Sequence, residues 1–393
     1  MMNKLLTVVM LVTLGGCGEG GTKLVGGTDG GSGDGGLDAG SDDAGSSPRA
    51  IDLLLVIDDS RYFAGHLSDL QTWLTGLGTS IDGLSSTSPR SWHLGVVSAD
   101  LGAGPFTLSN GQCHPGGAGA KLRGVGPAAS ATCAPLHAGK PYVDLDQAGG
   151  TSNLPTTESL GAALACAGAL GSSGCMFSSP LESAYRALHD PVPENAGFLR
   201  ADALLVVVFV TAQDDCSADA STDLFDPSKT AQYGALSPYR CTQFGIACGT
   251  PLSLMPYGDS GGPLSACAPA TTDQGGKLLD VRKYTDYFAT AGGVKADPSL
   301  VTLMAISGPT SPVSSVLGNP LTQPAAYSSC PSPNGNSCEV VLQHSCVGTN
   351  TSAVADPAIR LSAVVQSAAH RVTSSACDAD YAAVRSAIVA LAQ

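Results

Sequence analysis

The sequence predicts an α/β fold with a mostly parallel central sheet, flanking helices and long, disulfide-rich loop insertions. Three observations carry this prediction. Strongly apolar runs of strand length recur along the chain, segments with helical apolar spacing lie between them, and Cys-containing stretches rich in Gly, Pro and Ser break the alternation. Strands that alternate with helices favour a parallel sheet that is covered on both faces.

Four segments have the composition of buried strands. Residues 51–57 form a Leu-rich run that only Asp52 interrupts, and residues 203–211 (ALLVVVFVT) give the strongest strand pattern of the chain. Residues 93–97 and 300–306 are shorter runs of the same kind. Apolar runs without alternation indicate strands that are buried on both faces, as in a parallel sheet.

Helical spacing appears between these runs. Apolar residues from Phe63 to Leu84 recur at intervals of three and four, which predicts one amphipathic helix. A further helix is expected around residues 160–170, with Thr156 or Thr157 as its N-cap.

Two more helix starts can be read from the sequence. The segment Ser179-Pro180-Leu181-Glu182 has the pattern of a capping box with proline at the first helical position. The final helix is expected to begin near Asp378 or Asp380.

The cysteine content predicts an exported, disulfide-bonded protein. Of 13 cysteines, all but Cys17 form an even set without paired CxxC motifs, so disulfides are expected and zinc is not. Pairing of close neighbours is plausible for Cys113 with Cys133, Cys166 with Cys175 and Cys241 with Cys248, but spacing leaves the connectivity open. The long inserts 101–155, 214–276 and 308–350 are expected to be held against the sheet by such bonds. The twelve cysteines are Cys113, Cys133, Cys166, Cys175, Cys216, Cys241, Cys248, Cys267, Cys330, Cys338, Cys346 and Cys377.

The beginning of the chain has the pattern of an export signal. A short apolar run ends in Leu14-Gly15-Gly16-Cys17, which resembles the lipobox of bacterial lipoproteins. That resemblance implies cleavage before Cys17, acylation of this residue and a lipid anchor in the cell envelope. Because Gly18 rather than Asp follows, it implies the outer membrane. An ordinary secretory signal is the alternative, and either one takes the chain out of the cytoplasm.

Composition divides the rest of the chain in two. Residues 18–49 are Gly, Ser, Asp and Ala with few large apolar side chains, so a disordered tether is expected between the signal at 1–17 and a folded part at 50–393. The net charge of −14 argues against binding to nucleic acid or to anionic lipid surfaces.

A set of collinear motifs resembles the von Willebrand factor A (vWA) domain. Val56-Ile57-Asp58-Asp59-Ser60 is followed by HLGVVSADLG at 93–102, GCMFSSPLESAYRAL at 174–188, NAGFLRADALLVVVFVTAQDDCS at 195–217 and ADPAIRL at 355–361. The match is closest to the Cys-rich vWA lipoproteins of myxobacteria. It implies a Rossmann-like fold that binds a divalent ion, usually Mg²⁺, at the carboxyl ends of its strands.

Several ligand positions of that family are altered in this chain. Asp58 and Ser60 match the first two ligands, but Tyr62 stands where a second Ser is expected and Ala212 stands where an Asp is expected. Ser178 falls where these lipoproteins usually carry an acidic residue. The resemblance therefore implies a vestigial site and no cofactor.

Two alternatives for the altered site remain. Asp59, Asp214 and Asp215 could gather with Asp58 at one rim and hold an irregular Ca²⁺ or Mg²⁺ shell. The favoured alternative is that Asp58 and Ser60 only hydrogen-bond loop amides and cap the first helix.

One motif points to a different class of protein. Gly258-Asp259-Ser260-Gly261-Gly262-Pro263-Leu264 resembles the nucleophile signature of trypsin-like serine proteases, with Ser260 as the catalytic residue. No His occurs in that family's upstream context, and the comparable stretch Ala368–Arg371 follows Ser260 inside an expected helix. The alternating strands and helices also differ from that family's double β-barrel. A chance match is therefore favoured over a hydrolase.

The sequence thus supports three functional hypotheses, of which the first is favoured. The chain is a lipid-anchored envelope protein whose vWA-like domain binds an unknown protein or an extracellular matrix ligand, without enzymatic activity. The second hypothesis is a secreted serine hydrolase that uses Ser260. The third is a purely structural envelope protein.

Overall fold

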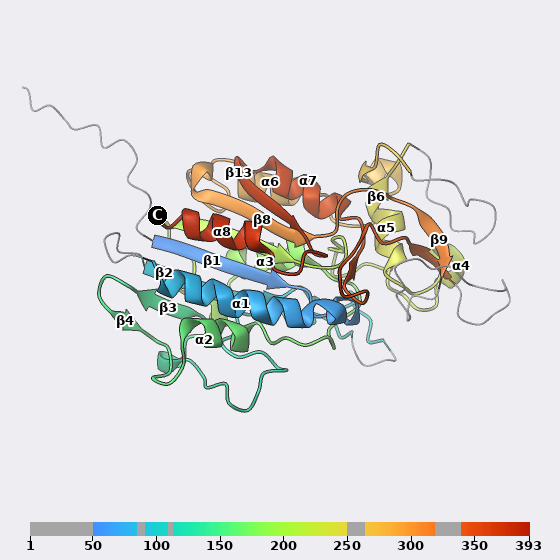
Figure 1. Ribbon diagram of the computed structural model, residues 1–393. Helices are drawn as coiled ribbons and strands as arrows, with labels where there is room; N and C mark the ends of the chain where they lie inside the picture. Colours follow the sequence, from blue (N-terminus) through green and yellow to red (C-terminus); the bar gives the residue numbers. More distant parts are fainter. Residues whose placement is uncertain (1–49, 85–90, 109–112, 250–263, 319–338) are drawn as a thin grey trace, which may run out of the picture. The chain divides into compact units, whose positions relative to one another are not determined.

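A computed structural model describes residues 50–84, 91–108, 113–249, 264–318 and 339–393. A seven-stranded sheet runs through them in the order β13-β8-β5-β1-β2-β3-β4 (Figure 1). The five strands from β13 to β2 are parallel, and β3 and β4 are added antiparallel at one edge. The strands are β1 (Ala50–Ile57), β2 (Ser91–Ser98), β3 (Val143–Asp146), β4 (Thr151–Ser152), β5 (Leu204–Val210), β8 (Val301–Ser307) and β13 (His370–Ser375).

Helices cover both faces of this sheet, as the sequence predicts. One face packs against α1 (Leu67–Asp82), α2 (Leu160–Ala167) and α8 (Ala382–Ala390). The other face packs against three more helices, α3 (Pro180–His189), α6 (Arg282–Ala289) and α7 (Ile359–Ser367). The α/β class with a mostly parallel sheet is therefore confirmed.

Smaller elements occupy the inserts. They include the helices α4 (Thr230–Tyr233) and α5 (Tyr239–Gly245) and the two-stranded ladders β6–β7 (Ile246–Ala247, Ala268–Pro269), β9–β10 (Ser315–Gly318, Glu339–Leu342) and β11–β12 (Cys346–Val347, Val354–Ala355). A 3₁₀ helix, Arg61–His66, joins β1 to α1.

The apolar runs explain why β1 and β5 lie at the centre of the sheet. Successive residues of β1, such as Leu53 and Leu54, point to opposite faces and enter different apolar clusters. All seven residues of β5 are buried. A strand that is apolar on both sides is stable only between two helical layers, which both strands have.

The predicted strands at 51–57, 93–97, 203–211 and 300–306 are all confirmed, whereas the edge of the sheet differs from the prediction. Ala368–Arg371 was expected in a helix, but α7 ends at Ser367 and His370 begins β13. The sequence of β13, HRVTSS, is polar because this edge strand is largely exposed or only partly buried. Periodicity therefore did not reveal it.

Helix starts also differ in detail. Neither Thr156 nor Thr157 caps α2, since the Ser159 side chain accepts the amide N–H of Ala162. Ser179 precedes α3 but forms no side-chain cap. The amides of the first turn of α3 are satisfied by a neighbouring loop, because Asp215 Oδ1 accepts Leu181 N–H at 3.1 Å.

Five disulfides are present in the described residues. Three of them join an insert to another part of the fold, as expected, whereas the two bonds of the insert 214–276 close loops within that insert. The suggested neighbour pairing of Cys113 with Cys133 is wrong, as are the analogous pairs Cys166 with Cys175 and Cys241 with Cys248. The observed pairs are Cys113–Cys175, Cys133–Cys166, Cys216–Cys241, Cys248–Cys267 and Cys346–Cys377.

A buried charge network lies at the amino ends of the central strands. The Asp52 carboxylate is fully buried and accepts hydrogen bonds from Arg200 Nε and from the Arg200 amide, both at 2.7 Å. The Lys295 ammonium lies 3.9 Å from the same carboxylate. His93 contacts the carbonyl oxygen of Phe198 through Nδ1 at 2.7 Å. Asp52 is thus the centre of a buried ionic network.

Candidate functional site

The candidate site lies where the loops after β1 and β5 meet. The chain adds β2 and β3 on one side of β1 and then returns to place β5 on its other side, so β1 and β5 flank the topological switch point. In open α/β sheets, ligands bind beyond the carboxyl ends of the strands at this point. The two loops begin at the same position along the sheet, because Ile57 pairs with Val210 and Asp58 N–H donates to the Val210 carbonyl at 2.9 Å.

Asp58 is hydrogen-bonded by neutral donors from both loops. Its carboxylate accepts the Ser60 amide at 2.9 Å and the Thr211 hydroxyl at 3.0 Å. The Ser60 hydroxyl donates to Gln213 Oε1 at 3.4 Å. Only 1% of Asp58 is exposed, and burial raises the pKa of this carboxyl.

Tyr62 and Ala212, which stand at two altered ligand positions, pack in the protein interior. Tyr62 is buried, and its hydroxyl accepts a hydrogen bond from Arg61 Nη2 at 3.0 Å. Ala212 belongs to the core cluster that also contains Ala355. An octahedral Mg²⁺ shell needs compact oxygen ligands. Neither side chain supplies one, so the residues at this position do not fit the ion that the vWA resemblance implies.

A second carboxyl pair lies beside Asp58. Burial, and then the charge of Asp100, raises the pKa of Asp59 to about 7. Burial also raises the pKa of Asp100, whose carboxylate accepts the Gly102 amide at 2.7 Å. Asp59 was a candidate in the sequence, whereas Asp100 was missed. The signal that could have found it is its position two residues after β2 in the motif HLGVVSADLG.

Asp214 and Asp215 serve helix N-termini instead. Asp214 Oδ1 accepts the amides of Arg360 and Leu361 at 3.0 Å each, in the first turn of α7, and burial raises the pKa of Asp214 to about 6. Asp215 is fully buried, contacts the first turn of α3 and pairs with Arg360 Nη2 at 3.1 Å. The structure therefore does not bring these two residues to Asp58. Among the described residues, no three His, Cys, Asp or Glu side chains are placed to share an ion.

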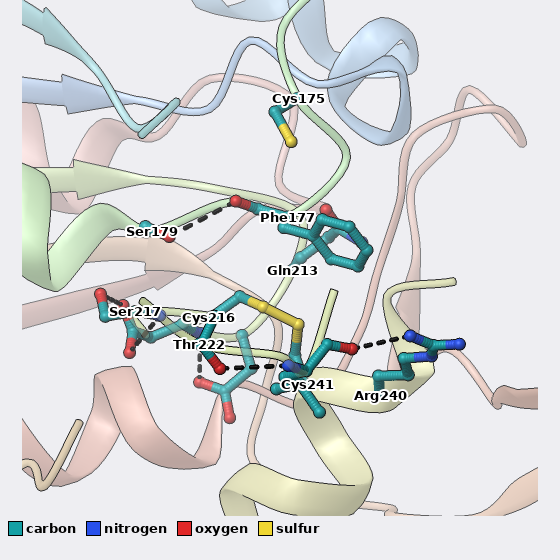
Figure 2. The surroundings of a disulfide bond; sticks show 12 residues. Cys175, Phe177, Ser179, Gln213, Cys216, Ser217, Thr222, Arg240 and Cys241 are labelled. Atoms are coloured by element: carbon teal, nitrogen blue, oxygen red, sulfur yellow. Dashed lines mark hydrogen bonds between the residues drawn. A yellow bond between two sulfur atoms is a disulfide. The ribbon is translucent and has the colours of Figure 1, made fainter. Parts of the chain in front are cut away.

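A buried apolar cluster, which we call the aromatic cap, covers this end of the sheet. It contains Phe177 and Phe225, whose rings stack with centroids 4.2 Å apart, and two disulfides. Figure 2 shows one of them, Cys216–Cys241, with the Phe177 and Arg240 side chains around it. The buried members of the cap are Tyr62, Ala103, Leu108, Cys113, Cys175, Met176, Phe177, Cys216, Leu224, Phe225, Tyr233, Cys241 and Leu278.

One open space at this end lies beside the cap, and another lies at the ends of β8 and β13. A cavity of about 320 Å³ is lined by residues of α3 and α6, including Glu182 and Lys283, and by the loops after β2 and β5. Four of its charged side chains form pairs, since Lys283 Nζ donates to Glu182 Oε2 at 2.6 Å and Arg186 Nε donates to Asp190 Oδ2 at 3.2 Å.

The remaining candidates are not placed. Cys17, Ser260, Cys330 and Cys338 lie outside the described residues. Of the histidines upstream of Ser260, His66 is fully buried and contacts the Val354 carbonyl oxygen through Nε2 at 2.9 Å.

Comparisons with known proteins leave the family open. The chain matches no protein-family model and no curated protein. Within the described ranges, no helix combines the length and the apolar character needed to cross a membrane. The five disulfides are consistent with an exported protein.

Proposed function

We propose that this chain is a lipid-anchored envelope protein whose vWA-like domain binds another protein or an extracellular matrix ligand. The observation that carries the proposal is the arrangement of Asp58, Ser60 and Thr211 at the switch point of the sheet. The strand order supports the same class. Without the two-residue β4, the strands stand in the order third, second, first, fourth, fifth and sixth along the chain, which is a doubly wound order.

The proposed binding does not use an ion at the Asp58 position. Asp58 already accepts hydrogen bonds from Ser60 and Thr211, and Tyr62 and Ala212 contribute packing instead of ligand oxygens. Partner contact is then made by the loops around the aromatic cap. The lipobox at Cys17 would place the domain at the envelope, at the outer membrane by the Gly18 criterion.

Site-specific photo-crosslinking in intact producing cells tests this function. Ala220 is exposed on the loop after β5 and lines the cavity beside the cap, whereas Ala296 is exposed before β8 at the opposite end of the sheet. A photo-reactive residue at Ala220 should give a discrete crosslinked product that EDTA does not remove, and one at Ala296 should give none. Equal products at both positions, or none at Ala220, would contradict the proposal.

The motif around Ser260 favours a serine hydrolase as the second candidate. A fluorophosphonate probe separates the two functions. We expect no labelling of the wild-type chain. Labelling that Ser260→Ala abolishes would replace the binding function with a hydrolase.

A further inference from the structure

Three segments meet beside the Asp58 position. Gly174 N–H donates to the Asp59 carbonyl at 2.8 Å, and four residues later Ser178 forms an antiparallel bridge with Asp100. The segment 174–178 therefore crosses the loops after both β1 and β2. Its Cys175 is fixed by the disulfide to Cys113.

The backbone of two glycines lies against the carboxylates of Asp59 and Asp100. A Cβ atom at Gly174 would lie 2.4 Å from Asp59 Oδ1, and one at Gly117 would lie 2.3 Å from Asp100 Oδ1. Neither glycine can take a side chain while the carboxylates hold these places. The pair is thus set in position by its surroundings.

A buried hydroxyl lies next to this pair without a partner. Ser178 is 2% exposed, and its Oγ makes no hydrogen bond to any described residue. Residues directly opposite in an antiparallel pair have Cβ atoms about 4.5–5.5 Å apart on the same face. The Ser178 hydroxyl therefore lies on the same side of the bridge as the Asp100 carboxylate. A buried polar atom without a partner beside two carboxylates is available to a bound ion, because leaving it unpaired costs free energy.

The charges around the pair are unbalanced. The charges of Asp58 and Asp100 act on Asp59, the charge of Asp58 acts on Asp100, and the basic group that acts on Asp100 is the exposed His114. Buried carboxylates are normally paired or bound to a metal. By contrast, the buried Asp52 at the other end of β1 has Arg200 and Lys295 beside it.

We propose that Asp59, Asp100 and Ser178 hold one hard divalent cation, displaced from the closed Asp58 position. Two carboxylates and a hydroxyl from separate loops form an irregular oxygen set, which Ca²⁺ accepts when backbone oxygens and water complete the shell. Asp100 is only partly buried, so an ion can reach the site from solvent. Its carboxylate is held by the Gly102 amide at 2.7 Å and by a backbone hydrogen bond from Cys175.

Isothermal titration of the EDTA-treated full chain at pH 8 tests the site, with CaCl₂ and MgCl₂ as separate titrants. We expect one Ca²⁺ site with a Kd on the order of 10⁻⁴ to 10⁻³ M, as in extracellular modules. Asp59→Asn and Asp100→Asn should each weaken it about tenfold or more, because ligand charge sets affinity. Ser178→Ala should weaken it less. Asp219→Asn, at an exposed carboxylate held by Ser221, is the matched control and should bind like the wild type.

The variant Asp58→Asn separates this inference from the proposed function. The inference takes only one premise from the proposed function, namely that no ion binds at Asp58. Ca²⁺ binding that persists in Asp58→Asn and is lost in Asp59→Asn supports both. Binding that is lost in Asp58→Asn but kept in Asp59→Asn and Asp100→Asn overturns both. No heat and no rise in unfolding temperature at millimolar Ca²⁺ or Mg²⁺ overturns this inference alone. Thermal unfolding in EDTA verifies that each variant is folded.

Discussion

The two ends of β1 each bury an aspartate, and they do so in different ways. At the amino end, Asp52 contacts the Arg200 guanidinium at 2.7 Å and lies 3.9 Å from Lys295. At the carboxyl end, Asp58 is held by an amide and a hydroxyl, with two more carboxyls, Asp59 and Asp100, nearby.

This difference separates a structural role from a functional one. A buried carboxylate beside cations is compensated within the protein and anchors the strands that contact it. Buried carboxyls without cations hold their protons more tightly, and such perturbed groups concentrate at functional sites. The carboxyl end of the sheet is therefore the end where we expect ligands, and the amino end is part of the scaffold.

The largest expected effect comes from removing the cationic partner of Asp52 at the amino end of β1. Arg200→Met removes the main partner of Asp52 and leaves a buried carboxylate, so the free energy of unfolding should fall by about 3–5 kcal/mol. Urea denaturation measures this change. Arg282→Met, at an exposed pair with Asp280, is the control and should change stability by less than about 1 kcal/mol. Equal losses in the two variants would contradict the structural role of Asp52.

The second effect concerns the carboxyl end of the sheet, where burial of Asp59 makes the stability of the fold depend on pH. The pKa of Asp59 is about 7 in the folded chain against an ordinary value of 3.8, so the folded state binds the proton more tightly. The stability from this group is fully present below pH 3.8 and is lost as the pH rises through about 7. Asp59→Asn should remove that pH dependence, which is on the order of 2–4 kcal/mol. Denaturation in EDTA between about pH 4 and pH 8 measures it. Parallel wild-type and variant profiles would show that Asp59 is not perturbed.

A smaller effect tests how Asp58 is held. Thr211→Val keeps the shape of the side chain and removes the hydroxyl that donates to Asp58 at 3.0 Å. The loss should be about 1–3 kcal/mol, the cost of leaving a buried acceptor short of a donor. Thr302→Val is a matched control, because the buried Thr302 hydroxyl has no partner among the described residues. A loss at Thr302 as large as the loss at Thr211 would contradict the account of Asp58.

The central sheet could be predicted from the sequence, and its edges could not. Residues 51–57 and 203–211 are apolar without alternation, a pattern that only a doubly covered strand needs. The edge strand β13 and the antiparallel pair β3–β4 at the other edge are polar, since strands at an edge have fewer buried positions. Their pairing is set by tertiary contacts that periodicity does not record.

The residues of the candidate site could be predicted where they belong to a recognisable sequence motif. Asp58, Ser60, Tyr62 and Ala212 follow from the vWA resemblance. The role of Asp215 at the start of α3 could not be predicted, because Leu181 lies 34 residues away in sequence and meets it only in the fold. The disulfide pairs were missed for the same reason.

Anomalous diffraction from crystals soaked in Mn²⁺ tests the central claim most directly, since manganese takes the same oxygen ligands as magnesium. The account predicts no manganese bound by Ser60 and Thr211, and any peak at this end of the sheet should lie between Asp59 and Asp100. A six-coordinate ion held by the Ser60 hydroxyl, with Tyr62 and Ala212 displaced from their packing, would contradict it.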